Sequence, residues 1–395
     1  MSNSIKIESI QLLKDGHRLE FDIIANSIST RIYFQVEGAV LTPSAEAFVL
    51  MTLLPAMKLG SEIEIEEAVS GKLISSLPDI QSILRQWFPE EDLKKFPIEN
   101  IPLKRENPPK NLKSATFSSG GIDSYYSLIK NQSEITDIIF IKGFDIKLNN
   151  EVLLKNSLEL VQKIGNHFNK NVIVIETNLK LFLNRYVNLR IHFGVFLSSI
   201  AHLLSNRIRK VFIPAGDSYA RILPHGSHPL LDPMFSSESM QIVHDGCEST
   251  RLEKLKTISD SDFAVNNLRV CFNAHTSFLT NCEWCEKCIR TKLGLLIINK
   301  LSNNPSFKKP IEIGRIRKLK LRPNIKNYYT EILYELEKTG EYPELCYAVS
   351  SILNQQSFIK TNRELMQKYL QRLKYKFPNL YDIFYLGNPK TKRLN

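Results

Sequence analysis

Residues 114–130 read SATFSSGGIDSYYSLIK, and this stretch decides the fold. Its first four residues are small, β-branched or aromatic, which is typical of a short buried strand. From Ile122 to Lys130 the apolar side chains have helical spacing, so a strand, a glycine turn and a helix are predicted in succession. Two glycines let the backbone approach a ligand closely, and the following helix presents free N–H groups and its positive dipole end to an anion. The stretch therefore predicts a phosphate-binding loop.

Seven residues of this loop and of the first helical turn are expected to surround the phosphates: Ser118, Ser119, Gly120, Gly121, Ile122, Asp123 and Ser124. Serine hydroxyls add hydrogen-bond donors, and Asp123 can hold Mg²⁺ against phosphate oxygens. Asp123 and Ser119 are therefore candidate catalytic residues. No Lys follows the glycines, so the loop is not of the Walker A type.

Short apolar runs alternate with amphipathic segments after the loop. We expect further strands at 137–141, 172–176 and 211–214 and a possible fifth at 268–272, with helices at 152–168 and 193–204. The run at 172–176 is almost wholly apolar, as in a strand buried on both faces. Alternation of this kind predicts an α/β domain over residues 112–300, with a Rossmann-like parallel sheet covered by helices on both faces.

The flanking segments follow other patterns. Residues 1–105 predict a small α+β domain, with strands at 5–13, 18–24, 30–36 and 61–67, a helix beginning near 42–44 and a short helix at 79–87. A stretch rich in proline and charge at 103–111 predicts a linker after this domain. Residues 301–395 predict an all-α extension, with helices at 324–338, 342–354 and 361–376.

Composition narrows the class of protein. The chain has 395 residues, of which 43% are apolar and 24% are charged, so extensive disorder and coiled-coil architectures are excluded and two or three domains are expected. The most apolar windows, 47–57 and 191–204, are shorter than the roughly 18 residues that a spanning helix needs. We therefore expect a soluble cytoplasmic protein without membrane contact. Its oligomeric state stays open.

Four of the six cysteines lie close together in the sequence: Cys271, Cys282, Cys285 and Cys288. Four thiolates complete a tetrahedral Zn²⁺ site and leave no open position for catalysis, so a structural zinc is expected. An iron–sulfur cluster or unrelated free thiols are the alternatives. Cys247 and Cys346 have no recognisable partner in the sequence and are expected to be ordinary buried thiols.

The segment SGGIDS at 119–124 matches the SGGxDS loop of the PP-loop ATP pyrophosphatases. Together with the later cysteine cluster it resembles the 7-cyano-7-deazaguanine synthase family, over roughly residues 114–295. The resemblance implies a HUP-type Rossmann-like fold in which the loop holds the β,γ-phosphates of ATP. It also implies that the adenine lies near Ile141 and Lys142 and that the four cysteines hold zinc.

The same resemblance implies an activity. Such enzymes adenylate a carboxylate, here 7-carboxy-7-deazaguanine or a related 7-deazapurine, with pyrophosphate release, and ammonia or an amine then displaces AMP. Synthase-like proteins with extra domains occur in bacterial biosynthetic and antiviral-defence gene clusters, so one version would join the base to a partner protein. Two alternatives stay open: a tRNA-modifying PP-loop enzyme and a catalytically silent nucleotide-binding adaptor.

A segment rich in histidine and acidic residues follows the fourth predicted strand. The carboxyl end of such a strand faces the ligand crevice of an open sheet. The candidate substrate-binding residues in this region are Asp217, His225, His228, Asp232, Glu238 and His244. The alternative is that they hydrogen-bond within a long loop. A second metal at His225 and His228 is disfavoured, because no matching third ligand lies nearby.

Arg251 and Lys254 are the remaining candidate catalytic residues, since their charges can neutralise phosphate or developing negative charge. Alternatively they lie on a solvated helix face.

The net charge of +11 is unevenly distributed. Residues 301–395 hold 18 Lys and Arg against 8 Asp and Glu, so nearly all of the excess lies in the predicted extension. Such a basic segment can bind RNA, dock an acidic protein partner or only improve solubility.

Overall fold

The computed structural model describes residues 4–104, 113–271 and 281–354, and the structural statements below concern these residues. The strands of the main sheet are β1 (Ser4–Leu13), β2 (Arg18–Ala25), β3 (Ile28–Glu37), β4 (Glu62–Glu64), β7 (Lys113–Phe117), β8 (Ile135–Lys142), β9 (Asn171–Thr177), β10 (Ile208–Pro214) and β11 (Gln241–Asp245). Two short strands pair separately, β5 (Val69–Ser70) and β6 (Leu103–Lys104).

The longer helices are α1 (Ala45–Leu59), α2 (Gly71–Trp87), α3 (Ile122–Lys130), α4 (Glu151–Phe168), α6 (Leu189–Leu203), α7 (Arg251–Ile258), α9 (Glu286–Ile297), α11 (Pro323–Thr339) and α12 (Pro343–Asn354). The shorter ones are α5 (Leu179–Leu183), α8 (Asp262–Asn266) and α10 (Ile313–Arg317). Three 3₁₀ turns are η1 (Pro89–Glu91), η2 (Tyr219–Arg221) and η3 (Asp232–Phe235).

The strands β11, β10, β7, β8 and β9 lie side by side in that order, and all of them run parallel. Side chains alternate along β8: Ile139 and Ile141 enter one core, whereas Ile138 and Phe140 enter the core on the opposite face. Both faces are therefore buried, as the apolar strand runs predicted. The α/β class with a mostly parallel mixed sheet is confirmed.

The possible fifth strand at 268–272 was wrong in position, since the fifth parallel strand is β11. In the described part of that segment the backbone N–H groups are used elsewhere. Arg269 N donates to Gly120 O at 2.7 Å, and Val270 N donates to the Asn281 side chain at 2.9 Å. Backbone N–H groups that bond to a loop and to a side chain are not available for hydrogen bonds to a neighbouring strand.

The sheet continues into the N-terminal segment. β3 pairs antiparallel with β9, with Phe34 opposite Thr177. Beyond β3 the strands β2, β1 and β4 lie side by side in the sheet in that order. Side chains of β2 alternate between buried and half-buried positions, so this part of the sheet packs on one face. One hydrophobic core joins the N-terminal strands to the parallel strands. Residues 105–111 of the predicted linker lie outside the described residues.

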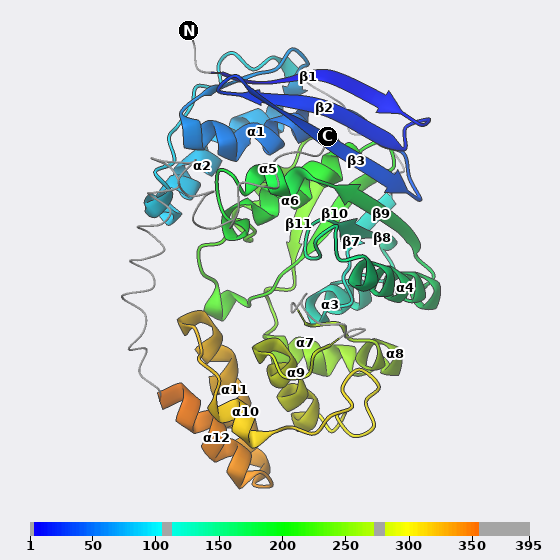
Figure 1. Ribbon diagram of the computed structural model, residues 1–395, viewed down its shortest axis with the longest axis vertical. Helices are drawn as coiled ribbons and strands as arrows, with labels where there is room; N and C mark the ends of the chain where they lie inside the picture. Colours follow the sequence, from blue (N-terminus) through cyan, green and yellow to red (C-terminus); the bar gives the residue numbers. More distant parts are fainter. Residues whose placement is uncertain (1–3, 105–112, 272–280, 355–395) are drawn as a thin grey trace, which may run out of the picture.

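Helices cover the parallel strands on both faces (Figure 1). One core contains α1, α2, α5 and α6, and the other contains α3, α4, α7 and α8. A third core joins α9 to α10, α11 and α12. The two predicted helices at 324–338 and 342–354 correspond to α11 and α12, whereas the one at 361–376 lies outside the described residues. Within 4–104, 113–271 and 281–354, no helix has the length and hydropathy that a membrane crossing requires.

Candidate functional site

The predicted strand, turn and helix of the loop are all present. Gly120 has a φ of 76°, in the left-handed region, and a Cβ there would lie 2.7 Å from Leu160 Cδ2, so the backbone and the available space both favour glycine. Gly121 is the N-cap of α3 and supplies no side-chain cap. The first N–H groups of α3 therefore have no capping side chain and point out of the helix at the carboxyl end of β7.

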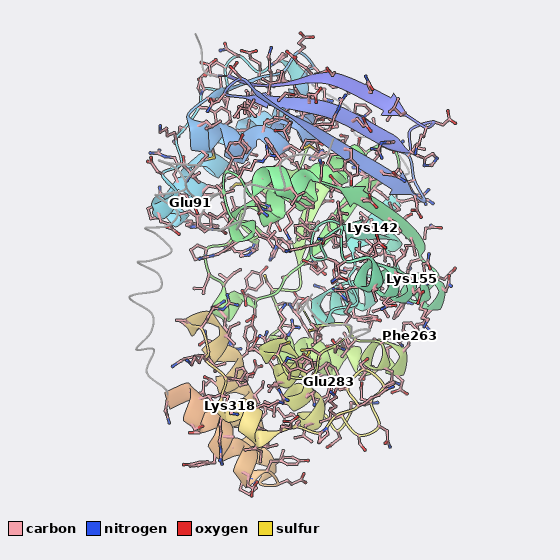
Figure 2. All side chains as sticks on the ribbon, viewed as in Figure 1. Glu91, Lys142, Lys155, Phe263, Glu283 and Lys318 are labelled. Carbon is pink, nitrogen blue, oxygen red and sulfur yellow. The ribbon has the colours of Figure 1, made fainter. Side chains whose placement is uncertain are left out.

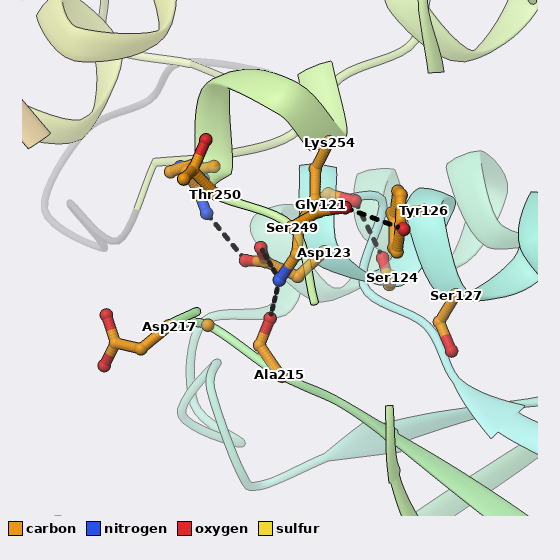
Figure 3. A network of polar contacts seen from close by, with 12 residues as sticks. Gly121, Asp123, Ser124, Tyr126, Ser127, Ala215, Asp217, Ser249, Thr250 and Lys254 are labelled. Carbon is orange, nitrogen blue, oxygen red and sulfur yellow. Dashed lines mark hydrogen bonds and ion pairs between the residues drawn. The ribbon is translucent and has the colours of Figure 1, made fainter. Parts of the chain in front are cut away.

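Asp123, in the first turn of α3, contacts two cations of α7. Its Oδ2 accepts a hydrogen bond from Arg251 Nη1 at 2.6 Å, and its Oδ1 lies 3.6 Å from Lys254 Nζ. Lys254 Nζ also donates to Ala215 O at 2.6 Å, as Figure 3 shows. Burial raises the pKa of Asp123, but the charges of Arg251 and Lys254 outweigh it and lower that pKa overall. Asp123 is therefore a carboxylate at neutral pH.

The start of α7 explains why both cations face the loop. Thr250 and Glu253 form a capping box, which sets the beginning of the helix at Arg251. Arg251 and Lys254 are three residues apart and so project from the same face. Their side chains are 11% and 1% exposed, so neither belongs to a solvated helix face.

Two further cations come from α9 and were missed by sequence reasoning. Arg290 is buried, and its guanidinium lies 4.1 Å from the centre of the Tyr328 ring. Burial, together with the charges of Arg251 and Arg290, lowers the pKa of Lys287 to about 7. Lys287 and Arg290 lie three residues apart, on one helix face, each two positions after a cysteine of the cluster, and that pattern is the signal that could have indicated them.

Tyr328 connects the helical extension to this site. Its hydroxyl donates to Asp217 Oδ1 and lies 3.3 Å from Gly216 O, at the carboxyl end of β10. Asp217 is thus brought to the cationic group, and α11 supplies part of its surroundings. No local sequence signal links Tyr328 to Asp217, which lie 111 positions apart.

Ser118, Ser119 and Ile141 line a small cavity of about 40 Å³ beside the loop, together with Arg269. That volume holds about one water, so a nucleotide base enters only if neighbouring side chains move. Lys142, labelled in Figure 2, is not part of this lining; its Nζ lies 3.9 Å from Glu37 and 4.0 Å from Glu176.

Arg269 is a further residue that sequence reasoning missed. Its Nη1 donates to Ser119 O at 3.4 Å, and its side chain lines the cavity beside the loop. The residue is only 5% exposed, and its Nε has no hydrogen-bond partner within the described ranges. Burial lowers the pKa of its guanidinium. An isolated arginine in an apolar stretch carries no motif, so its place beside the loop follows only from the fold.

Asp232 and His244 are brought together from η3 and β11. Asp232 Oδ2 accepts hydrogen bonds from His244 Nδ1 and from Ser227 Oγ, both at 2.7 Å. Burial lowers the pKa of His244, but interactions with the Asp232 carboxylate and with Cys247 outweigh burial and raise that pKa to about 9. His244 is therefore an imidazolium at neutral pH, paired with a fully buried carboxylate.

The other predicted substrate residues have structural contacts outside the cationic group. His225 Nδ1 accepts from Ser227 N at 3.1 Å, and the ring of His228 packs 4.6 Å from that of Trp87. Glu238 accepts from Lys72 N at 3.0 Å, in the first turn of α2. The expected alternative, hydrogen bonding within the loop, describes His225 and His228, and Glu238 serves a helix terminus. Among the described residues, the only side chains that lie close enough together to hold a metal ion are those of four cysteines.

The four cysteines lie together as expected, with their sulfur atoms within 4.8 Å of one another. Cys271 Sγ is 3.8 Å from Cys285 Sγ, and Cys282 Sγ is 3.9 Å from Cys288 Sγ. A tetrahedron with Zn–S bonds of about 2.3 Å has edges of about 3.8 Å. None of the four described cysteines takes part in a disulfide bond, so this cluster is suited to a structural zinc. It lies at the start of α9, near Glu283 in Figure 2.

The chain matches no protein-family model, no curated protein and no solved structure. The function is therefore argued from the residues of the site.

Proposed function

We propose that this chain is an ATP-dependent adenylating enzyme that activates a carboxylate with release of pyrophosphate. One observation carries the proposal: Arg251 and Lys254 converge on Asp123 at the uncapped N-terminus of α3. Helix N–H groups, buried cations and a carboxylate at one strand end are what a magnesium–triphosphate complex needs.

Asp123 fits a magnesium ion. Its Oδ1 is buried and accepts no hydrogen bond from the described residues, so that carboxylate oxygen remains available to a cation. A bound Mg²⁺ would supply charge neutralisation at the phosphates. The chain's own groups would do the rest: the loop would hold the β,γ-phosphates, and Arg251 and Lys254 would stabilise the charge that grows on departing pyrophosphate.

The substrate class comes from the resemblance of the loop and the cysteine cluster. We infer 7-carboxy-7-deazaguanine or a related 7-deazapurine carboxylate, whose oxygen attacks the α-phosphorus and gives an acyl adenylate and pyrophosphate. Ammonia or an amine, on a small molecule or on a partner protein, then displaces AMP. A zinc at the cysteine cluster supports this site, because α9 begins there and carries Lys287 and Arg290.

Location and partners belong to the same proposal. We place the enzyme in the cytoplasm, where the nucleotide is available and a thiolate-bound zinc is stable. Residues 355–395, outside the described residues, hold 9 Lys and Arg against 2 Asp and Glu. An RNA or an acidic protein partner would bind there.

The test is pyrophosphate release from ATP and Mg²⁺ in the presence of 7-carboxy-7-deazaguanine. Two variants of α7 form a matched pair, since Lys254 contacts Asp123 whereas Lys256 is half exposed and pairs with Glu335. We expect Lys254→Met to lower the rate by about 10²-fold and Lys256→Met to leave it within about twofold. ATP binding without pyrophosphate release would indicate the adaptor instead. Release with tRNA but not with the carboxylate would indicate tRNA modification.

A further inference from the structure

Arg269 is a buried cation whose charge is not paired by a carboxylate of the described residues. The residue is 5% exposed, its Nη1 donates to the backbone oxygen of Ser119 at 3.4 Å, and its Nε makes no hydrogen bond to the described residues. The charge of Asp145 attracts the guanidinium, but the two side chains form no ion pair. A buried charge without a paired charge is costly, so an anion bound beside Arg269 would stabilise it.

Two other arginines show how a buried or half-buried guanidinium is usually paired in this chain. Arg207 donates two hydrogen bonds to Oδ1 of the fully buried Asp137, at 2.6 and 3.0 Å. Arg251 donates to Asp123 Oδ2 at 2.6 Å. Arg269 differs from both, since its hydrogen bond goes to a neutral carbonyl group and no carboxylate completes it.

Arg269 lies against the start of the phosphate loop. Its backbone N–H donates to Gly120 O at 2.7 Å, and a Cβ built on Gly120 would lie 3.5 Å from Arg269 Cβ. With Ser118 and Ser119, Arg269 also lines the cavity of about 40 Å³, which neither of the two α7 cations lines. The loop therefore has cations at both ends, Arg269 at its start and the α7 cations at Asp123.

The segment that carries Arg269 is held in place on both sides of it. Asn281 accepts a hydrogen bond from Val270 N at 2.9 Å and donates to Leu268 O at 2.8 Å. Leu268 N donates to Ser306 Oγ at 3.0 Å. These contacts fix the backbone before any ligand binds, so the guanidinium needs little rearrangement to meet an anion.

We propose that Arg269 binds the α-phosphate of ATP, and of the adenylate formed from it, at the start of the loop. This inference rests on the proposed function, in which the loop and the α7 cations hold the β,γ-phosphates. The three phosphates of ATP form one chain, so a cation at the opposite end of the loop meets the phosphate that remains on AMP. The cavity has room for about one water, which is the size of a phosphate oxygen and not of a base.

The chemistry of arginine suits this role. The guanidinium presents several N–H donors to one phosphate, and its charge is permanent. When the carboxylate oxygen attacks the α-phosphorus, negative charge grows on the oxygens of that phosphate. Arg269 would stabilise this charge, whereas Arg251 and Lys254 act on the departing pyrophosphate.

Calorimetry of the full chain with Mg²⁺ and either ATP or pyrophosphate tests the assignment, because only ATP has an α-phosphate. We expect Arg269→Met to weaken ATP binding by about 10–100-fold and to leave pyrophosphate binding within about threefold. Lys254→Met is the matched control and should weaken the binding of both ligands. Unchanged ATP affinity in folded Arg269→Met, or an equal loss for both ligands, would overturn the inference and leave the adenylation intact. No binding of ATP by the wild type would overturn the proposed function and the inference together.

Melting of the ligand-free chain separates phosphate binding from a structural role. We expect Arg269→Met to melt at the same temperature as wild type or higher, because it removes a buried charge that lacks a carboxylate partner. ATP should raise the melting temperature of wild type more than that of Arg269→Met. Arg207→Met is the control and should melt lower, since it leaves the buried Asp137 unpaired. A comparable drop in ligand-free Arg269→Met would show that its charge is already stabilised within the protein and would overturn the inference.

Discussion

The two halves of the main sheet differ in what surrounds their strands. In the parallel half, β7 to β11, helices bury both faces, and strand ends meet the N-termini of α3 and α7. In the antiparallel half, β1 to β3, hairpins join the strands and one face packs on α1. The candidate site residues gather in the parallel half. Phosphate chemistry needs strand ends and helix N-termini at one edge, which hairpins do not provide.

This contrast separates two kinds of substitution. Changes at the strand ends of the parallel half are expected to alter activity, whereas changes in the antiparallel half are expected to alter stability alone. Substitutions in the two halves probe this contrast, beginning with the largest expected effect.

Cys288→Ser is expected to have the largest effect, because it removes a ligand from the cluster at the start of α9. Structural zinc contributes on the order of 10 kcal/mol in small domains. Metal analysis should show about one zinc per wild-type chain and almost none in the variant, with a lower melting temperature. Cys346→Ser, outside the cluster, is the control and should keep its zinc. Full zinc content in Cys288→Ser would contradict the assigned site.

Phe21→Ala tests the antiparallel half. The ring is fully buried and packs 5.1 Å from Phe48 and 6.2 Å from Phe34. Its removal should lower the free energy of unfolding by about 3–5 kcal/mol, measured by urea denaturation. Pyrophosphate release per folded molecule should stay unchanged. A loss of activity in fully folded Phe21→Ala would show that the two halves are not separate in function.

The ion pair of His244 and Asp232 is expected to make stability depend on pH. The folded pKa of about 9 lies above the usual 6.5, so this contribution is fully present below pH 6.5 and is lost as the pH rises through 9. This rise in the pKa of His244 corresponds to about 3 kcal/mol of folding stability. Urea unfolding from pH 6.5 to 10 should show the advantage of wild type over His244→Gln shrinking by about that amount. An advantage that stays constant or grows over this range would refute the ion pair.

Gly120 and Gly121 form a matched pair within the loop. Gly120→Ala should lower the free energy of unfolding by about 1–3 kcal/mol, because a left-handed φ and a contact with Leu160 both oppose a side chain. At Gly121 φ is −83°, and a Cβ would be 3.7 Å from its nearest neighbour, so Gly121→Ala should cost less than about 0.5 kcal/mol. Its methyl group would nevertheless face the phosphates, and calorimetry should show weaker ATP binding. Unchanged ATP affinity in Gly121→Ala would argue against phosphate binding at this turn.

Local patterns explain which features could be predicted from the sequence. The loop between β7 and α3 and the cysteine cluster both lie within short stretches whose spacing reflects their geometry. By contrast, β11 has five residues, of which Gln241, His244 and Asp245 are polar, and a loop rich in proline and histidine precedes it. Such a strand is hard to distinguish from loop, so the fifth strand was expected elsewhere.

Contacts between distant segments explain the rest. The pairing of β3 with β9 joins residues more than 130 positions apart, and no local signal indicates it. The same holds for the Tyr328 contact with Asp217 and for the place of Arg269 beside the loop.

The most direct test of the adenylating site is exchange of labelled pyrophosphate into ATP by wild type and Asp123→Asn. The amide keeps the size of the side chain but removes the charge that pairs with Arg251 and Lys254. We predict exchange that depends on 7-carboxy-7-deazaguanine in wild type and falls by about 10²–10³-fold in the variant, while the protein remains folded. Exchange at the wild-type rate in Asp123→Asn would contradict the assignment of this site.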